Sequence, residues 1–198
     1  TLVMNILLIG KQTSGKGTQA IILKTKLKVP HISSGDMFRE HLKNKTDLGN
    51  KADSYMKKGE LVPDELVIKM VQERIQKPDT KKGYILDGFP RTAPQAKALS
   101  EITKLDKVIQ IKISDEEATN RMVNRRTCMK CQHIYNLYTM PKPQDPAVCD
   151  KDSSPLIQRD DDFPEPIAER LEIYKKETEP LLKLYRKDKI LKTVDGTK

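Results

Sequence analysis

Residues 2–18 read Leu-Val-Met-Asn-Ile-Leu-Leu-Ile-Gly-Lys-Gln-Thr-Ser-Gly-Lys-Gly-Thr, an apolar run from Leu2 to Ile9 that leads directly into a glycine-bearing segment. An apolar run interrupted only by Asn5 is typical of a strand covered on both faces within a parallel sheet. From Gly15 to Leu27 the apolar residues recur at helical spacing. The segment therefore predicts a strand, a glycine loop and a helix, which is the start of a βαβ unit.

The loop from Gly10 to Thr18 fits the pattern Gly-x4-Gly-Lys followed by Gly-Thr. This is the pattern of a phosphate-binding loop, with one residue inserted before the usual hydroxyl. Small residues let backbone N–H groups converge on phosphate oxygens, and the helix N-terminus adds a positive potential. A glycine-rich turn after any strand can look similar, but the strand, the paired glycines, the lysine and the helix together favour a phosphate site. We expect Lys16 to reach the transferring phosphates.

The rest of the chain alternates between strand and helix patterns. Further strands are expected at 83–87, 107–113 and 190–194, and helices at 64–76, 92–102 and 115–126. A long last helix should begin at Pro164 and run toward Arg186, with a break or kink at Pro180. This alternation predicts an α/β fold, with a parallel-sheet core and helices on both faces.

Two segments fit the alternation poorly and are the candidate insertions. Residues 33–62 favour two short polar helices, whereas residues 124–162 are rich in Pro, Cys and Asp. The core would then consist of residues 1–32, 63–123 and 163–198. A chain of 198 residues is long enough for one such compact unit with excursions.

Composition narrows the classes of function without choosing among them. No apolar run approaches the roughly 20 residues that span a bilayer, and the N-terminal run does not resemble a secretory signal, so we expect a cytoplasmic protein without membrane contact. The formal net charge of +9 suggests polyanionic partners, which nucleic acid and small phosphorylated ligands both satisfy. Most lysines are scattered along helical stretches, as on any solvated helix face.

The cysteines favour a metal site over a disulfide framework. All three lie within 22 residues, in the order Cys128-x2-Cys131, seventeen residues, and then Cys149-x2-Asp152. Two chelating turns of this kind complete a tetrahedral site with no open position, which is typical of structural Zn²⁺. His133 or Asp150 are alternatives to Asp152 as fourth ligand. Reduced cysteines without metal are a further alternative, and a redox role is weaker because the motif does not open a helix after a βα unit.

Several segments together resemble the adenylate kinases over essentially the whole chain. The most specific is Asp87-Gly88-Phe89-Pro90-Arg91 with Gln95 four residues later. The other matching segments are the Gly-Lys-Gly-Thr of the loop, Ser33-Ser34-Gly35-Asp36-Met37-Phe38-Arg39, Arg121-x3-Arg125, and Arg159-Asp160-Asp161-Asp162 with Arg170. The cysteine pattern is similar to the zinc-bearing lids of some bacterial members of this family.

The resemblance implies Mg²⁺-dependent phosphoryl transfer in which ATP and AMP are converted to two ADP, carried out by a monomer. Residues 33–62 would form the AMP-binding lobe and residues 124–162 a lid over ATP. The implied catalytic residues are Lys16, Asp87, Arg91, Arg125, Arg159 and Arg170. The implied ATP-binding residues are Gly10, Thr13, Ser14, Gly15, Lys16, Gly17, Thr18, Arg121, Arg125, Ile134, Tyr135 and Lys198. The implied AMP-binding residues are Ser34, Arg39, Val62, Gly88, Arg91, Gln95, Arg159 and Arg170.

The chemistry accounts for the number of arginines, because transfer between two nucleotides gathers many negative charges at one point and offers no covalent step to the protein. Arginine forks bind phosphate bidentately and stay charged. No general base is required, and His31, His41 and His133 fall outside the matched positions. Asp87, at the end of an expected core strand, could order the water shell of Mg²⁺.

The chain departs from the family pattern inside the loop, where Gln12-Thr13 replaces the usual Pro-Gly. If that position needs a positive φ, Thr13 carries a strain of roughly 1–3 kcal/mol.

Two other functions remain open at this point. A zinc-containing nucleic-acid-binding protein would suit the positive charge, but aromatic residues for base stacking are scarce. A kinase for another monophosphate or phosphate donor is the nearer rival, although Gln95 and the long lid favour AMP and ATP.

Overall fold

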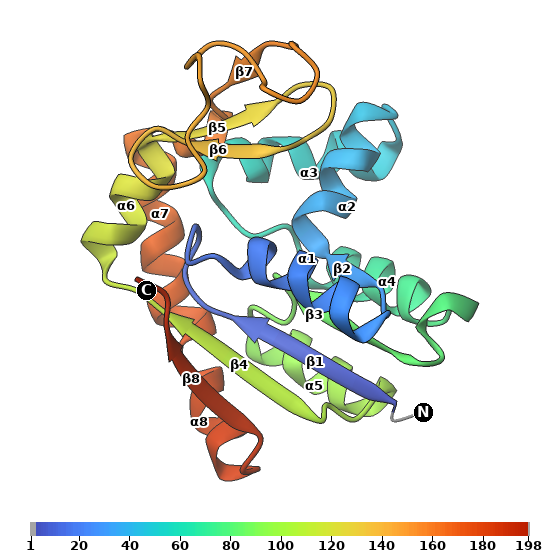
Figure 1. Ribbon diagram of the computed structural model, residues 1–198. Coiled ribbons are helices and arrows are strands. Elements are labelled where there is room, and N and C mark those ends of the chain that lie inside the picture. Colours follow the sequence, from blue (N-terminus) through green and yellow to red (C-terminus); the bar gives the residue numbers. More distant parts are fainter. Residues whose placement is uncertain (1–2, 198) are drawn as a thin grey trace.

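A computed structural model describes residues 3–197 (Figure 1). Five strands in this part of the chain form a parallel sheet in the order β2-β3-β1-β4-β8. The strands are β1 (Met4–Ile9), β2 (His31–Ser33), β3 (Gly83–Asp87), β4 (Lys107–Lys112) and β8 (Leu191–Asp195). The expected fold class is confirmed, and Leu2, the first residue of the expected opening strand, lies outside the described residues.

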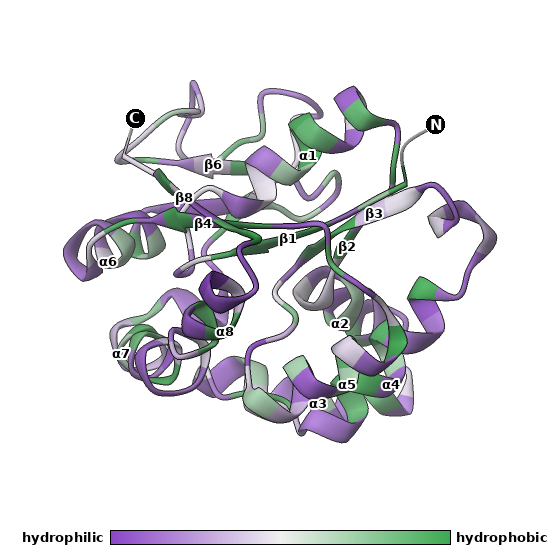
Figure 2. Cartoon of the chain, turned by 90° about the horizontal axis from the view of Figure 1, so that it is seen from below, coloured by the Kyte–Doolittle hydropathy of each residue, from purple (hydrophilic) through white to green (hydrophobic). Residues whose placement is uncertain are grey.

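Helices cover both faces of this sheet, as Figure 2 shows with α1 on one side and α4, α5 and α8 on the other. The α-helices are α1 (Lys16–Leu27), α2 (Ser34–Lys43), α3 (Asp47–Lys58), α4 (Asp64–Ile75), α5 (Ala93–Ile102), α6 (Asp115–Val123), α7 (Pro164–Ile173) and α8 (Leu181–Lys187). Short 3₁₀ turns occur at η1 (Pro78–Thr80) and η2 (Asp160–Asp162), and a π-helical turn at η3 (Tyr174–Thr178).

The central strand β1 explains the two-sided core. Ile6 and Leu8 pack with Ala20 of α1, whereas Leu7 and Ile9 join the larger cluster on the opposite face. All four of these strand residues are at most 3% exposed. A strand with apolar side chains on both faces needs a helix layer on each side, which is what the continuous apolar run predicts.

The segment after β2 contains the two short helices that its sequence predicts, α2 and α3. Ser33 caps α2 by accepting the Asp36 N–H, and Thr46 caps α3 by accepting the Gly49 N–H. Strand β2 was not expected. Its three residues, His31 to Ser33, are too few and too polar for a periodicity signal, and it exists because it pairs with β3.

The expected helix at 115–126 is wrong at its C-terminal end. Helix α6 stops at Val123, and Arg125 and Arg126 belong instead to strand β5 (Arg125–Cys128). This strand pairs antiparallel with β6 (Ile134–Asn136) and β7 (Leu156–Ile157) in a small second sheet of order β6-β5-β7. Long-range pairing overrides the local helical spacing here.

The break expected at Pro180 takes the form of a widened turn. Helix α7 passes into the π-helical turn η3, and α8 begins directly after Pro180. Because proline has no N–H to donate, a locally wider turn lets the chain continue in nearly the same direction. None of the helices within residues 3–197 combines the length and the apolar character that crossing a bilayer requires.

Candidate active site

The phosphate loop lies between the C-terminal end of β1 and the start of α1 (Figure 1). Gly15, with φ of 98°, precedes the helix in a conformation that side chains rarely adopt. Lys16 turns back into the loop, where its Nζ donates to the carbonyl oxygens of Gly10 at 2.8 Å and Lys11 at 2.7 Å. Burial lowers the pKa of Lys16 to about 8, and the charge of Asp87 partly opposes this. The ammonium group is therefore held in a site that an anion would stabilise.

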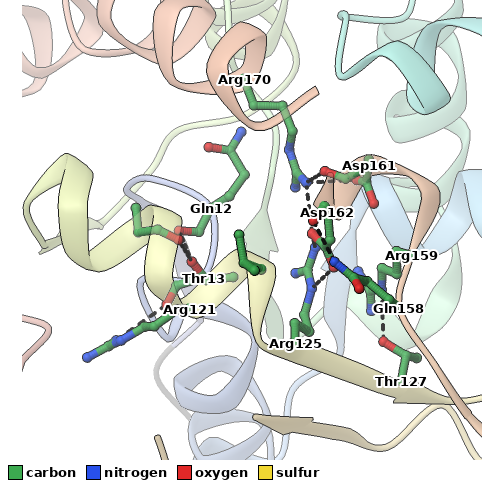
Figure 3. A network of polar contacts seen from close by, with 12 residues as sticks. Gln12, Thr13, Arg121, Arg125, Thr127, Gln158, Arg159, Asp161, Asp162 and Arg170 are labelled. Carbon is green, nitrogen blue, oxygen red and sulfur yellow. Dashed lines mark hydrogen bonds and ion pairs between the residues drawn. The ribbon is translucent and has the colours of Figure 1, made fainter. Parts of the chain in front are cut away.

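Thr13 has the positive φ that the sequence analysis considered, at 56°. Its hydroxyl lies 3.0 Å from the carbonyl oxygen of Ala118 in α6, and Arg121 Nη1 donates to the carbonyl of Thr13 at 3.3 Å (Figure 3). The loop is thus tied to α6, the helix that leads into the second sheet. These bonds offset part of the strain of a β-branched residue in this conformation.

Beyond the loop, arginines and aspartates form a dense network (Figure 3). Arg125 donates through Nε and Nη2 to the two carboxylate oxygens of Asp162 at 2.7 and 2.5 Å. Arg170 contacts Asp161 at 2.9 Å and Asp162 at 3.4 Å. Asp162 is 0% exposed, so this fork is a buried ion pair.

The arginines differ in how far their charge is compensated. Burial alone would lower the pKa of Arg125, but Asp162 raises it above its usual range. Burial, together with the like charges of Arg125 and Arg39, lowers the pKa of Arg159 well below its usual range. Burial likewise lowers the pKa of Arg170 to about 10. Burial also lowers the pKa of Arg91, so an incoming anion such as phosphate would stabilise the charged forms of Arg91, Arg159 and Arg170.

Two cavities meet at this network. The larger has a volume of about 260 Å³ and the smaller about 80 Å³. Both are lined by Gly35, Arg39, Gly88, Arg91 and Arg170. Three arginines thus lie where the two cavities join. A negatively charged group could pass from one cavity to the other and stay in contact with these arginines.

Close packing around Gly88 shapes the smaller cavity. Ser34 Oγ and Arg91 Nε both donate to the carbonyl oxygen of Gly88 at 2.7 Å. A Cβ at Gly88, whose φ is 78°, would lie 2.8 Å from Ser34 Oγ and 2.9 Å from Arg91 Nη2. The positive φ favours glycine here, and a larger residue would also displace Ser34 and Arg91 from their present positions.

The larger cavity collects most of the residues expected at the ATP and catalytic positions. These are Thr13, Gly15, Lys16, Gly17, Thr18, Asp87, Arg91, Arg121, Arg125, Ile134, Tyr135, Arg159 and Arg170. Gly10 and Ser14 line neither of the two cavities, and Lys198 lies outside the described residues. Asp87 also has a neighbour that was not expected, since His31 Nε2 lies 3.4 Å from its carboxylate.

The smaller cavity collects the residues expected at the AMP positions, with one exception. Ser34, Arg39, Val62, Gly88, Arg91, Gln95 and Arg170 line it. Arg159 lines the larger cavity instead.

The second sheet brings three cysteines and one carboxylate together. One ligand atom each from Cys128, Cys131, Cys149 and Asp152 lies within 4.8 Å of the others. The Sγ atoms of Cys131 and Cys149 are 3.7 Å apart, close to the roughly 3.8 Å between sulfurs bound to one tetrahedral Zn²⁺. The backbone N–H groups of Lys130 and Cys131 both point at Cys128 Sγ, at 3.4 Å. The donor set and its spacing therefore fit zinc.

The other two candidates for the fourth ligand, Asp150 and His133, are not part of this cluster. The carboxylate of Asp150 accepts the N–H of Gln144 at 3.0 Å. The ring of His133 packs edge-on against Tyr135, with ring centroids 4.7 Å apart.

Sequence reasoning missed the contacts that join distant segments. Lys11 Nζ lies 2.5 Å from Asp115, whose other oxygen contacts Lys175 at 2.7 Å, so the loop is also tied to η3. Gln12 also lines the larger cavity, as its place within the loop indicates. Asp64 contacts Gln95 across 31 positions of sequence, for which no local signal exists.

Comparison with known proteins finds one family over nearly the whole chain. The family model described as adenylate kinase matches residues 8–190. The adenylate kinase of Staphylococcus epidermidis is 48% identical over 200 residues, covering 98% of this chain and 93% of that protein. The adenylate kinase of Archaeoglobus fulgidus is 50% identical, covering 98% of this chain and 92% of that protein.

Proposed function

The chain belongs to the adenylate kinase family, and on that premise we propose that its two joined cavities bind ATP and AMP and that the terminal phosphate passes between them. The products are two molecules of ADP, and the reaction is reversible. The observation that carries this proposal is the shared wall of the cavities, where Arg39, Arg91 and Arg170 line both.

ATP occupies the larger cavity in this proposal. Backbone N–H groups of Thr13 and of residues 15–18, at the N-terminus of α1, surround its phosphates. Arg121, Ile134 and Tyr135, which come from α6 and the second sheet, line the same cavity. The nucleotide would therefore lie between the loop and the segment 124–162.

AMP occupies the smaller cavity in this proposal. Val62 and Gln95 supply an apolar contact and an amide for the base, whereas Arg39 and Arg91 lie at the end that opens toward the larger cavity. The AMP phosphate would point toward the ATP phosphates. That orientation is the one that in-line transfer requires.

Charge neutralisation supplies most of the catalysis in this scheme. Phosphate binding raises the lowered pKa values of Lys16, Arg159 and Arg170 back toward their usual range, because negative charge favours their protonated forms. These groups are only partly exposed to solvent, so each interaction is stronger than it would be in water. The side chains are already positioned before the charge develops.

Mg²⁺ enters with ATP and supplies further neutralisation of the phosphates. Asp87 is the residue that would hold its water shell, since the carboxylate lines the larger cavity beside Lys16. A Cβ at Gly17 would lie 3.9 Å from Asp87 Oδ2, which shows how close this carboxylate is to the loop. Hard oxygen ligands suit Mg²⁺.

The metal cluster has a structural part in the proposal. Cys128, Cys131, Cys149 and Asp152 would hold one Zn²⁺ with no position left open. The apolar cluster of the segment is small, consisting of Cys128, Tyr135, Cys149 and Leu156. Zinc would therefore supply folding free energy that this core lacks.

The two excursions would move relative to the core. Residues 33–62 form the AMP-binding lobe and residues 124–162 the lid, with residues 1–32, 63–123 and 163–198 as the core. Closure of both over the nucleotides would exclude water and prevent loss of the phosphate to hydrolysis.

The test is a coupled assay of ADP formation from ATP and AMP with Mg²⁺, run beside GMP, CMP and UMP as acceptors and GTP as donor. Turnover selective for ATP and AMP, and lost in Lys16→Ala, is the expected result. Equal turnover with another acceptor would favour a kinase of different base specificity. No turnover together with salt-sensitive binding of DNA or RNA would favour a nucleic-acid-binding protein.

A further inference from the structure

Gln95 lies in the wall of the smaller cavity, and its amide is held by hydrogen bonds to Asp64 and Arg91. The side chain is 1% exposed, although it lines the cavity. Its Nε2 donates to Asp64 Oδ1 at 2.7 Å, and its Oε1 accepts the N–H of Arg91 at 2.8 Å. Asp64 is the first residue of α4 and does not itself line the cavity.

Thr92 completes this network. Its hydroxyl lies 3.0 Å from each carboxylate oxygen of Asp64. The same hydroxyl accepts the N–H of Gln95 at 3.3 Å as the cap of α5. The Asp64 carboxylate at the start of α4 is therefore held by Thr92, the N-cap of α5, and accepts a hydrogen bond from Gln95 within α5. Helices α4 and α5 lie side by side at this point (Figure 2).

These partners determine which end of the amide is which. An amide has an oxygen that only accepts and a nitrogen that only donates, and the two ends are nearly identical in shape. A carboxylate can only accept and the backbone N–H of Arg91 can only donate. A flipped amide would place oxygen against the Asp64 carboxylate and two donors against each other at Arg91, leaving the buried amide of Gln95 without these two partners.

We infer that Asp64, acting through Gln95, makes the acceptor site select a 6-aminopurine over a 6-oxopurine. After Asp64 and Arg91 are satisfied, the amide retains one N–H donor and one oxygen lone pair. Adenine offers an amino donor at C6 and an acceptor at N1, which match this pair. A 6-oxopurine offers an acceptor at C6 and a donor at N1, which would require the flipped amide.

Asp64 is therefore a positioning residue rather than a catalytic one. A free amide could flip and read both kinds of purine, so selectivity requires the restraint as well as Gln95 itself. The inference rests on the proposed function, because it assumes that the smaller cavity binds AMP.

The experiment compares AMP with IMP, which differs from it only at the purine N1 and C6 positions. We would measure kcat and KM for both acceptors in wild-type protein and in Asp64→Asn, at saturating ATP and well below the unfolding temperature of each variant. Asparagine keeps the size of the side chain but can donate, so it tolerates either orientation of Gln95. The expected result is a fall of about tenfold in the AMP-to-IMP ratio of kcat/KM, since one charge-assisted hydrogen bond no longer opposes the flip. KM for ATP should stay within about twofold.

Glu65→Gln is the matched control, because it removes one negative charge from the same first turn of α4 at an exposed position. Its AMP-to-IMP ratio should remain that of the wild type. Thr92→Val removes the hydroxyl that holds Asp64 and should shift the ratio in the same direction as Asp64→Asn, which provides the test if Asp64→Asn does not fold.

Three outcomes are distinguishable. A lowered ratio in both variants supports the inference. An unchanged ratio in Asp64→Asn, even with reduced stability or a raised KM for AMP, overturns it and leaves Asp64 a structural residue only. Absence of AMP turnover in the wild-type protein would instead overturn the proposed function.

Discussion

Replacing Asp162 by asparagine tests a buried carboxylate that pairs with Arg125 at the other end of the segment 124–162 and with Arg170 of helix α7. Asp162 is 0% exposed and accepts two hydrogen bonds from Arg125, with Arg170 at 3.4 Å. Asn has the same shape, but it carries no charge and turns a donor toward a guanidinium group. The substitution therefore removes the charge partner of two arginines without leaving a cavity.

The magnitude follows from the cost of leaving a buried charge unpaired. Breaking one partner of a buried pair costs about 3–5 kcal/mol, and for a chain of this length each kcal/mol lowers the melting temperature by roughly 2–4 °C. We expect the melting temperature of Asp162→Asn to fall by about 6–20 °C. Activity should also fall, because Arg125 loses the contact that orients it toward the larger cavity.

Thermal unfolding followed by circular dichroism measures this change, and Asp160→Asn is the control. Asp160 lies two residues away and is exposed, so its substitution should alter stability by no more than about 0.5 kcal/mol. A melting temperature of Asp162→Asn within about 2 °C of the wild type, with unchanged turnover, would refute the argument that the pairing of Asp162 with Arg125 and Arg170 stabilises this region.

Three further predictions concern the loop and the metal cluster. Lys16 has a pKa of about 8 and binds phosphate when it is protonated. ATP affinity measured by calorimetric titration should therefore weaken by up to about tenfold per pH unit above pH 8. An ATP affinity that does not change up to about pH 9.5 would contradict this. Protein prepared without chelators should contain about one Zn²⁺ per chain. Chelation should lower the temperature of the first unfolding transition in scanning calorimetry, while the core stays folded. A content far below one Zn²⁺ per chain would contradict the site. Thr13→Gly should keep or improve activity, since relief of roughly 1–3 kcal/mol of strain outweighs a hydrogen bond of about 0.5–1.5 kcal/mol, and a large loss of ATP affinity would show that the loop works differently.

Local sequence was sufficient for the core because its signals are local. The apolar run of β1, the glycines of the loop and the spacing of α1 each constrain the backbone within a few residues. Strand β3 and helix α4 likewise lie within one residue of their expected bounds. Apolar residues on both faces of a strand require helices on both faces, so the layered architecture followed from the pattern.

The same reasoning failed where pairing with a distant segment overrides local preference. Residues 125 and 126 have helical spacing with the residues before them, yet they pair with residues 135 and 136 in the second sheet. Strand β2 owes its existence to its register with β3. Such choices depend on which segments meet after the chain folds, and no window of neighbouring residues contains that information.

The site shows the same division at the level of side chains. The phosphate-loop pattern predicted that Lys16 contacts phosphate, and the resemblance to adenylate kinases added Arg125 and Gln95 as candidates for phosphate and base. Only the tertiary structure shows which carboxylates contact Arg125 and Gln95. Asp162 lies 37 positions from Arg125 in the sequence, and Asp64 lies 31 positions from Gln95. Composition and periodicity describe a residue and its immediate neighbours, whereas the orientation and charge state of a buried side chain depend on partners that folding brings from elsewhere in the chain.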